Sequence, residues 1–226
     1  MTATTSSTEH TSQTGNGPHS GAIVAATGVP LSEARAAMIM IHGRGDSASG
    51  IIGLADAFSV PGVAYVALQA TSNVWYPYPF MSALEVNQPW LDSALAAIAE
   101  ATTALTSTGM PLDRVVLLGF SQGACLASEY AARHPRRYGG VVALSGGLIG
   151  PEIEESRYVG DLDGTPSFFG CSDVDPHIPI GRVTASADLF RSRGAAVEQR
   201  AYPGFGHSVN QDEVDWVHEL LVGLVG

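Results

Sequence analysis

Short apolar runs alternate with segments of helical periodicity along nearly the whole chain, and this order limits the possible folds most strongly. Residues 36–41, 63–68 and 115–118 are continuously apolar, which suits strands that are covered on both faces. Helical patterns lie between them, without an internal repeat or a linker. Alternating strands and helices form a mostly parallel sheet with helices on both faces, so we predict an α/β fold.

The predicted elements fill one domain, residues 21–226, whereas residues 1–20 are rich in Thr and Ser and predict a disordered tail. Further strands are expected at 22–26, 141–144, 167–170 and 197–202. Helices are expected at 47–59, 89–109, from the 119–123 turn to about 134, at 180–193, and after Asn210. Two longer connections remain, a proline-rich aromatic loop at 69–87 and a charged surface excursion at 148–164.

The composition excludes several classes of partner. A net charge of −11 over 226 residues argues against nucleic acid or an anionic membrane surface, because both need clustered Lys and Arg. No apolar stretch approaches the roughly 18 residues of a membrane span. Two cysteines, Cys125 and Cys171, form no disulfide framework, and no secretory signal is visible, so we expect a cytoplasmic protein.

The segment Gly119-Phe-Ser-Gln-Gly123 follows an apolar strand and precedes a helical pattern of small residues. A serine between two such glycines is typical of a nucleophile elbow, a sharp turn that lifts the hydroxyl above the sheet edge. The backbone N–H of Gln122 would then lie at a helix N-terminus, where it can stabilise an oxyanion. The alternative is a Gly/Ser turn that only joins a strand to a helix.

A serine nucleophile needs a histidine base and an acid, which follow it in the order Ser, acid, His in sheets of this kind. His207 lies in a glycine-flanked loop between a strand and a helix and is our candidate base. His177 and His218 are expected at the rim or the surface. The acid is either Asp175, which precedes a proline, or Asp173, and the residues alone leave both open.

A second oxyanion donor is expected from the loop after an earlier strand, where His42-Gly-Arg-Gly-Asp46 ends the 36–41 run. The backbone N–H of Arg44 is the candidate, together with that of Gln122. His42 itself is expected to hold this loop by a hydrogen bond rather than to transfer protons. His42, Ser121, Asp175 and His207 all follow strands, and ligands bind beyond the carboxyl ends of strands in open sheets, which predicts one common site.

These motifs together resemble the phospholipase/carboxylesterase family of α/β-hydrolases, which includes the acyl-protein thioesterases. The resemblance runs from about residue 36 to the C-terminus and rests on His42–Asp46, residues 119–123, Asp175-Pro-His-Ile-Pro179 and Gly204-Phe-Gly-His207. It implies an α/β-hydrolase fold and favours Asp175 over Asp173 as the acid. Two positions depart from the family pattern: Cys171-Ser172 replaces a His-Gly pair, and Arg44 stands where an apolar residue is common.

The resulting hypothesis is a serine carboxylesterase that acts through an acyl-serine intermediate, with Ser121, Asp175 and His207 as its triad. Thioester or lysophospholipid hydrolysis by the same residues, acyl transfer, and a non-catalytic binding protein on this scaffold are the alternatives. No metal or organic cofactor is implied, and the expected partner is a small ester or thioester. The aromatic loop offers Trp75, Tyr76 and Phe80 as substrate-binding residues or as plain packing.

Overall fold

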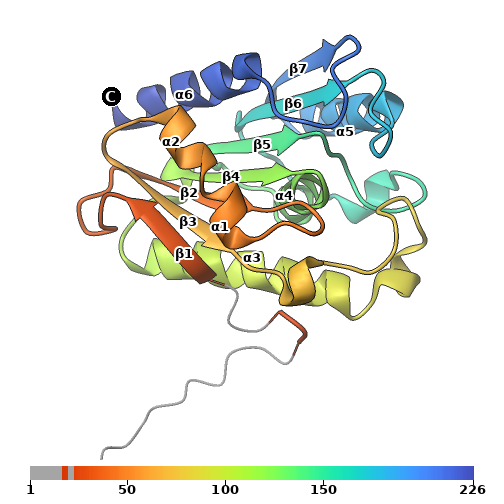
Figure 1. Ribbon diagram of the computed structural model, residues 1–226, viewed down its shortest axis with the longest axis horizontal. Coiled ribbons are helices and arrows are strands. Elements are labelled where there is room, and N and C mark those ends of the chain that lie inside the picture. The colour runs from red at the N-terminus through yellow and green to blue at the C-terminus, as the bar shows by residue number, and fades with distance from the viewer. Residues whose placement is uncertain (1–16, 20–22) are drawn as a thin grey trace, which may run out of the picture.

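A computed structural model describes residues 17–19 and 23–226 of the chain. Seven strands form one sheet in the order β1-β3-β2-β4-β5-β6-β7 (Figure 1). Only β1 runs antiparallel, and every other neighbouring pair is parallel, which confirms the predicted mostly parallel α/β fold. The strands are β1 Ile23–Gly28, β2 Ala36–Ile41, β3 Val63–Leu68, β4 Val115–Phe120, β5 Gly140–Leu144, β6 Pro166–Ser172 and β7 Ala196–Tyr202.

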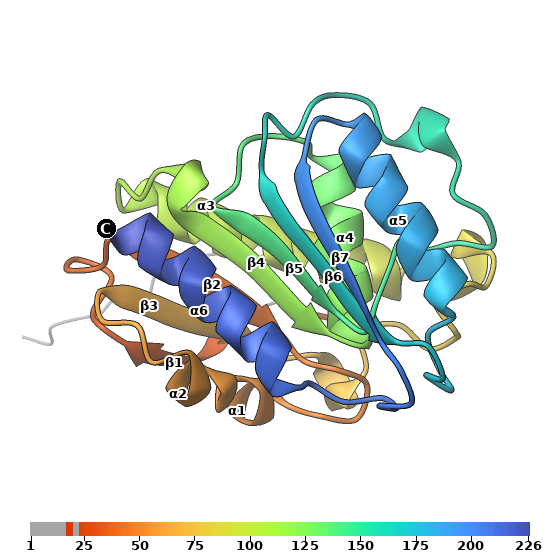
Figure 2. The same ribbon diagram turned by 90° about the horizontal axis from the view of Figure 1, so that it is seen from above.

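Helices cover both faces of the sheet, as Figure 2 shows from above. One face carries α3, α4 and α5, and the other carries α1, α2 and α6. The helices are α1 Ala48–Ile51, α2 Leu54–Phe58, α3 Trp90–Ser107, α4 Gln122–Arg133, α5 Ile180–Ser192 and α6 Gln211–Val225. Short 3-10 turns occupy Thr71–Asn73, Leu84–Asn87, Leu112–Arg114 and Glu155–Arg157.

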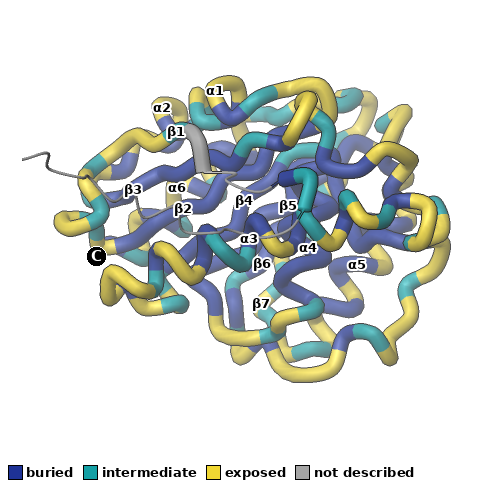
Figure 3. Tube along the Cα trace, turned by 90° about the horizontal axis from the view of Figure 1, so that it is seen from below, coloured by how far each residue is buried: buried dark blue, intermediate teal, exposed yellow. Residues whose placement is uncertain are grey.

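The central strands are buried on both sides, which explains their continuous apolar sequences. In β2 the side chains alternate: Ala37, Ile39 and Ile41 pack under α3 and α4, whereas Ala36, Met38 and Met40 pack under α1, α2 and α6. Figure 3 shows the buried strands at the centre of the molecule, with more exposed segments around them. Two apolar layers therefore hold the sheet rigid beneath the loops at its carboxyl edge.

The predicted helix at 47–59 is wrong in one respect, because the structure divides it into α1 and α2. The division lies at Ile52 and Gly53, where the Gly53 N–H donates to the carbonyl of Gly50 in a tighter turn. Glycine weakens a helix by about 1 kcal/mol relative to alanine, and two glycines fall within four residues here. The spacing of the apolar residues predicts a helix but does not indicate that the helix is interrupted.

The 148–164 connection is more than a surface excursion, because its apolar residues Leu148, Ile149, Tyr158 and Leu162 are fully buried. The buried carboxylate of Glu129 in α4 fastens it: Oε2 accepts hydrogen bonds from the Ile149 N–H at 2.9 Å and the Tyr158 hydroxyl at 3.0 Å. Oε1 pairs with Arg157 at 2.6 Å. A buried charge requires such partners, and the charges in this segment are therefore partly internal.

Most of the tail predicted to be disordered, and residue 22 of the first predicted strand, lie outside the described residues. Residues 17–19 are described, and His19 is buried. Its Nε2 lies 2.7 Å from the Trp75 carbonyl oxygen, and its backbone N–H donates to Ser93 Oγ at 2.9 Å. Within the described part of the chain, no helix is both long enough and apolar enough to cross a membrane.

Candidate active site

Ser121 occupies the turn between β4 and α4, with φ 55° and ψ −118°. Residues other than glycine rarely adopt this conformation, so the turn stores local strain. The flanking glycines make it possible: a Cβ on Gly119 would lie 2.2 Å from the Gly123 carbonyl, and a Cβ on Gly123 would lie 2.0 Å from the Ile41 oxygen. The predicted strand–turn–helix is present and places the serine hydroxyl above the carboxyl edge of the sheet.

A continuous chain of hydrogen bonds connects three side chains at this edge. His207 Nε2 lies 2.9 Å from Ser121 Oγ, and His207 Nδ1 lies 2.6 Å from Asp175 Oδ2. An ionised carboxylate can only accept, so Nδ1 carries the proton of the neutral ring and Nε2 is left to accept from the serine hydroxyl. This tautomer is the one in which the imidazole can remove the serine proton.

Asp175 is held as an anion. Its side chain is fully buried, and Oδ1 accepts hydrogen bonds from the N–H groups of His177 at 2.8 Å and Ile178 at 3.0 Å. Burial by itself raises the pKa of a carboxyl group, but the hydrogen bonds from His207 and from these two N–H groups outweigh it and lower the pKa of Asp175. The carboxylate therefore stays charged and fixes the orientation of the imidazole.

The neighbouring acid, Asp173, binds a backbone N–H group instead of the histidine. Its Oδ1 accepts from the N–H of Gly204 at 2.8 Å, in the loop that carries His207. Ser172, one of the two departures from the family pattern, accepts from the N–H of Gly206 at 3.0 Å. Asp173 and Ser172 thus bind the loop after β7 to the end of β6, and only Asp175 reaches the imidazole.

Two backbone N–H groups predicted to face an oxyanion flank the serine. Among the described residues, neither the N–H of Arg44 nor that of Gln122 donates a hydrogen bond. Gln122 is the first residue of α4, where the helix dipole adds positive potential. His42 holds the loop that carries Arg44: it is fully buried, Nδ1 bonds the Gly43 carbonyl at 2.7 Å, and Nε2 accepts from the Ala70 N–H at 3.1 Å.

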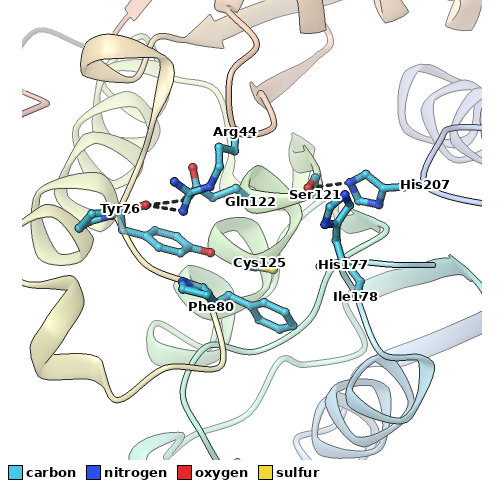
Figure 4. A pocket seen from close by; sticks show the side chains of 11 residues that line it. Arg44, Tyr76, Phe80, Ser121, Gln122, Cys125, His177, Ile178 and His207 are labelled. Atoms are coloured by element: carbon cyan, nitrogen blue, oxygen red, sulfur yellow. Dashed lines mark hydrogen bonds between the residues drawn. The ribbon is translucent and has the colours of Figure 1, made fainter.

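A pocket of about 540 Å³ opens beside Ser121 and His207 (Figure 4). Of the three aromatic residues predicted to bind substrate, Tyr76 and Phe80 line this pocket and Trp75 does not. The Trp75 ring is fully buried, and its Nε1–H donates to the His42 carbonyl at 2.9 Å. Trp75 is therefore a packing residue behind the pocket. The lining residues are Arg44, Tyr76, Pro77, Pro79, Phe80, Ser121, Gln122, Cys125, His177, Ile178 and His207.

The aromatic loop is fastened to the catalytic edge by two polar side chains. Gln122 Oε1 accepts from the Trp75 N–H at 2.9 Å, and Gln122 Nε2 donates to the Tyr76 carbonyl at 2.8 Å. Arg44 Nη2 donates to the same Tyr76 carbonyl at 2.7 Å and to the Tyr78 carbonyl at 3.2 Å. The two residues whose N–H groups were predicted to face the oxyanion therefore also hold the pocket wall with their side chains.

Sequence reasoning missed part of the pocket on the side of the acid. His177 and Ile178 line the pocket, and the His177 ring meets the His207 ring edge-on at 5.0 Å between centroids. His177 was expected at the rim, which its exposure agrees with, but not as a pocket residue. The available signal was its place two residues after Asp175, since the two N–H groups that bind the carboxylate belong to His177 and Ile178.

A strained serine turn, a histidine and a buried acid at the carboxyl edge of a mostly parallel sheet define the class of α/β-hydrolases. The chain belongs to the phospholipase/carboxylesterase family within this class, and the match covers residues 23–223. It is therefore a hydrolase of the esterase and thioesterase type.

Individual relatives agree with this assignment. The crystal structure of a phospholipase/carboxylesterase from Dyadobacter fermentans is 42% identical, covers 92% of this chain and 99% of its own, and superposes with a TM-score of 0.87. Acyl-protein thioesterase 1 of Saccharomyces cerevisiae is 29% identical over 82% of this chain and 91% of the yeast protein. The putative esterase NocK of Nocardia uniformis is 34% identical over 73% of this chain and 47% of its own length.

Proposed function

We propose that the protein hydrolyses carboxylic esters through an acyl-serine intermediate, with Ser121 as nucleophile, His207 as base and Asp175 as the residue that orients it. The observation that carries this proposal is the unbroken hydrogen-bond chain from Asp175 through His207 to Ser121. No displacement of a loop is needed to bring the three groups together. The family assignment supports the same reaction class.

In the first half of the reaction, Ser121 Oγ bonds to the ester carbonyl carbon while His207 Nε2 takes the hydroxyl proton. The carbonyl oxygen becomes an oxyanion that the N–H groups of Arg44 and Gln122 receive. The bond from carbon to the alcohol oxygen then breaks, and His207 returns the proton to that oxygen. The products of this half are a free alcohol and an acyl-serine.

In the second half, water replaces the alcohol. His207 Nε2 takes one proton from water, and the water oxygen bonds to the acyl carbon. The bond from carbon to Ser121 Oγ breaks, and His207 gives the proton back to the serine. A carboxylic acid leaves and the enzyme returns to its starting state. Asp175 stays ionised throughout and stabilises the imidazolium that forms twice in each cycle.

Thioester hydrolysis is the second candidate, because a relative at 29% identity is named acyl-protein thioesterase 1. The chemistry would be the same with a thiol as the leaving group. The pocket of about 540 Å³ lies in the lower half of the usual range for small-molecule sites, roughly 300–1,000 Å³. That size favours compact esters over long-chain acyl thioesters.

Turnover of a short p-nitrophenyl ester by the wild type and by Ser121→Ala tests the proposal. We expect the substitution to reduce kcat by a factor on the order of a million, as in other serine triads. Equal rates in both proteins would reject Ser121 as the nucleophile. The same panel, extended to long-chain acyl thioesters, separates the two candidates by their ratio of kcat/KM.

Labelling with a fluorophosphonate addresses the non-enzymatic alternative, a binding protein that retains the scaffold. We expect a covalent adduct on Ser121 of the native wild type and none on His207→Ala, because the hydroxyl then lacks its base. An unlabelled wild type that is folded and also fails to turn over any ester would favour the binding protein.

A further inference from the structure

The pocket beside Ser121 differs in charge from the rest of the molecule. The chain contains 22 acidic and 11 basic residues, yet no Asp or Glu among the described residues lines this pocket. Its ionisable lining groups are one arginine, two histidines, a tyrosine and a cysteine. An acidic protein repels anions at long range, so a cation placed within the binding cavity gives that cavity a distinct local potential.

Arg44 supplies this cation. Its guanidinium is held against the aromatic loop by the two hydrogen bonds from Nη2 to the carbonyls of Tyr76 and Tyr78. Guanidinium has five N–H donors, and those on Nε and Nη1 form no hydrogen bond within the described part of the chain. None of the ion pairs among the described residues involves Arg44. The residue is exposed overall, but its charged group is oriented and its charge is not neutralised.

Tyr76 supplies a second unused donor. The residue is 1% exposed, and its hydroxyl has no hydrogen-bond partner among the described residues. The Cys125 thiol lies close to this hydroxyl, but sulfur is a weak acceptor, so the contact satisfies the phenol poorly. Burial raises the pKa of the Tyr76 hydroxyl well above its usual value, so the hydroxyl stays protonated. Buried hydroxyls are rarely left unpaired, which points to an acceptor that arrives with the ligand.

Both donors belong to residues that line the pocket. Figure 4 shows the Arg44 guanidinium against the Tyr76 carbonyl and the Tyr76 hydroxyl directed toward Cys125, with Ser121 and His207 on the other side. A substrate whose ester carbonyl meets Ser121 would therefore direct its far end toward Arg44 and Tyr76. Carboxylate oxygens are the natural acceptors for a guanidinium and a phenol hydroxyl.

We infer that the preferred substrate is a compact ester that also carries a carboxylate, received by the Arg44 guanidinium and the Tyr76 hydroxyl. This inference rests on the proposed esterase function and narrows it to a substrate class. The carboxylate belongs either to the acyl half, as in a monoester of a short dicarboxylic acid, or to the alcohol half, as in an ester of a hydroxy acid. Both share the same chemistry, and a substrate panel distinguishes them.

The panel pairs each carboxylate ester with a neutral partner of similar size. For the acyl half, mono-p-nitrophenyl glutarate is compared with p-nitrophenyl pentanoate. For the alcohol half, 4-acetoxybenzoate is compared with 4-acetoxybenzamide. We expect the wild type to prefer the charged member of at least one pair by about tenfold or more in kcat/KM, the effect of a charge-assisted hydrogen bond. This preference should fall as salt is raised to about 0.5 M.

Arg44→Met and Tyr76→Phe separate recognition of the carboxylate from support of the loop. Loosening the loop lowers kcat/KM for both members of a pair, whereas loss of carboxylate recognition lowers their ratio. We expect Arg44→Met to bring the ratio close to one, mainly through KM for the charged ester, and Tyr76→Phe to lower it by a few-fold. The matched control is Asn87→Ala, which removes an uncharged support of the same loop, the bond from the Tyr78 N–H to Asn87 Oδ1 at 2.9 Å, and should leave the ratio unchanged.

A binding measurement keeps the inference testable without turnover. Calorimetric titration of Ser121→Ala with both members of each pair should give, in at least one pair, a Kd for the charged ester that is several-fold lower than for its neutral partner. Equal affinities in both pairs, a wild-type ratio at or below one in both pairs, or an unchanged ratio in Arg44→Met would overturn the inference. If Ser121 hydrolyses the neutral esters but shows no preference for the charged ones, only this inference is rejected. If the protein binds the charged ester more tightly but hydrolyses neither ester, the inference on binding is supported and the proposed reaction is rejected.

Discussion

The serine turn at 119–123 and residues 74–80, the aromatic part of the 69–87 connection and called the aromatic loop from here on, border the same pocket, but different forces determine their shapes. The turn is defined by its own backbone: a strained Ser121 and two glycines, neither of which has room for a Cβ. The aromatic loop has no regular backbone pattern of its own, and Pro77 and Pro79 exclude helix or inner strand. Its position comes from side chains elsewhere in the chain.

Three polar side chains hold that loop. Gln122 contacts the backbone of Trp75 and Tyr76, Arg44 contacts Tyr76 and Tyr78, and Asn87 accepts from the Tyr78 N–H and donates to the Pro79 carbonyl. Gln122 belongs to the serine turn and Arg44 to the loop beside it. The comparison teaches that a short rigid motif can orient a longer irregular one, so that the nucleophile and the pocket wall keep a fixed relation.

Substitution of Gly123 by alanine tests the rigid member of the pair and should have the largest effect. The new Cβ would lie 2.0 Å from the Ile41 carbonyl oxygen, so the turn cannot close without displacing β2 or α4. We expect the loss of activity to approach that of removing the serine, on the order of a millionfold, with destabilisation of several kcal/mol. Activity on p-nitrophenyl acetate and urea unfolding measure the two effects.

The control for this substitution is Gly223→Ala in α6. No heavy atom lies within 4 Å of a Cβ at that position, and alanine favours helix there by about 0.5–1 kcal/mol. Gly223→Ala should therefore stabilise the protein and leave its activity intact. A Gly123→Ala variant that keeps near-normal activity would show that the turn is not rigid in the way described.

The loop between β6 and α5 is an intermediate case, which Asp175→Asn and Asp173→Asn compare directly. An amide at 175 can donate to His207 Nδ1 and so favours the wrong imidazole tautomer, which in a serine protease lowers kcat about 10⁴-fold. Asp173 accepts only from the Gly204 N–H, and an asparagine oxygen can still do so. We expect Asp173→Asn to lose at most about tenfold. Similar losses in both variants would contradict the assignment of the acid.

The sequence was sufficient wherever a function depends on local backbone chemistry. The glycine spacing around Ser121 predicts the turn, and alternating apolar runs predict the mostly parallel sheet. Asn210 predicts the start of α6, where the structure has a full capping box with Glu213. Because all parallel strands end at one edge, chain order alone brought Ser121, His207 and two candidate acids to the same place.

Sequence reasoning failed where a side chain's environment depends on distant residues. Trp75 and Tyr76 are adjacent aromatics, but only Tyr76 enters the pocket, because the contacts with Gln122 and Arg44 set the direction of the loop. Asp173 and Asp175 are both close to the base, and burial among N–H groups distinguishes them. The burial of 148–164 required Glu129, which lies about twenty residues earlier, as its partner. None of these pairings produces a periodic pattern in the amino-acid sequence.

Gln122→Met tests the link between the two regions. Methionine keeps the length of the side chain but leaves the Trp75 N–H buried without its acceptor, which costs about 1–3 kcal/mol. The N–H of residue 122 remains available to an oxyanion. We therefore expect a loss of roughly 10- to 100-fold in kcat/KM from misplacement of the pocket wall, smaller than for Gly123→Ala.

Gln199→Met provides the matched control, because Gln199 is half-buried on β7 and, among the described residues, its amide donates only to Thr184. We expect that variant to stay within about 0.5 kcal/mol of the wild type, with normal kinetics. If Gln122→Met behaves like Gln199→Met in both assays, the aromatic loop holds its place without the serine turn, and the proposed dependence of one region on the other is wrong.

The smallest effect concerns Glu213, where a local pattern and its tertiary surroundings conflict. The residue caps α6, directly after the loop that carries His207, but it is 1% exposed. Burial raises the pKa of its carboxyl group from 4.5 to about 7, although the hydrogen bond from the Asn210 N–H opposes this. Between these two pH values the folded protein holds a proton that the unfolded chain has released. This retained proton therefore contributes fully to the free energy of unfolding below pH 4.5, and the contribution is lost as the pH rises to about 7.

Glu213→Gln should remove this dependence, because the amide oxygen still accepts from Asn210 and cannot ionise. Relative to the wild type, the variant should gain stability with rising pH, from almost nothing near pH 4.5 to at most about 3 kcal/mol above pH 7. Urea unfolding at several pH values measures the difference, with Glu219→Gln on the exposed face of the same helix as the control. A constant difference between Glu213→Gln and the wild type from pH 5 to pH 8 would mean that water reaches the carboxylate. In that case the local Asn210–Glu213 pattern alone would determine the helix cap, just as the local backbone determines the serine turn.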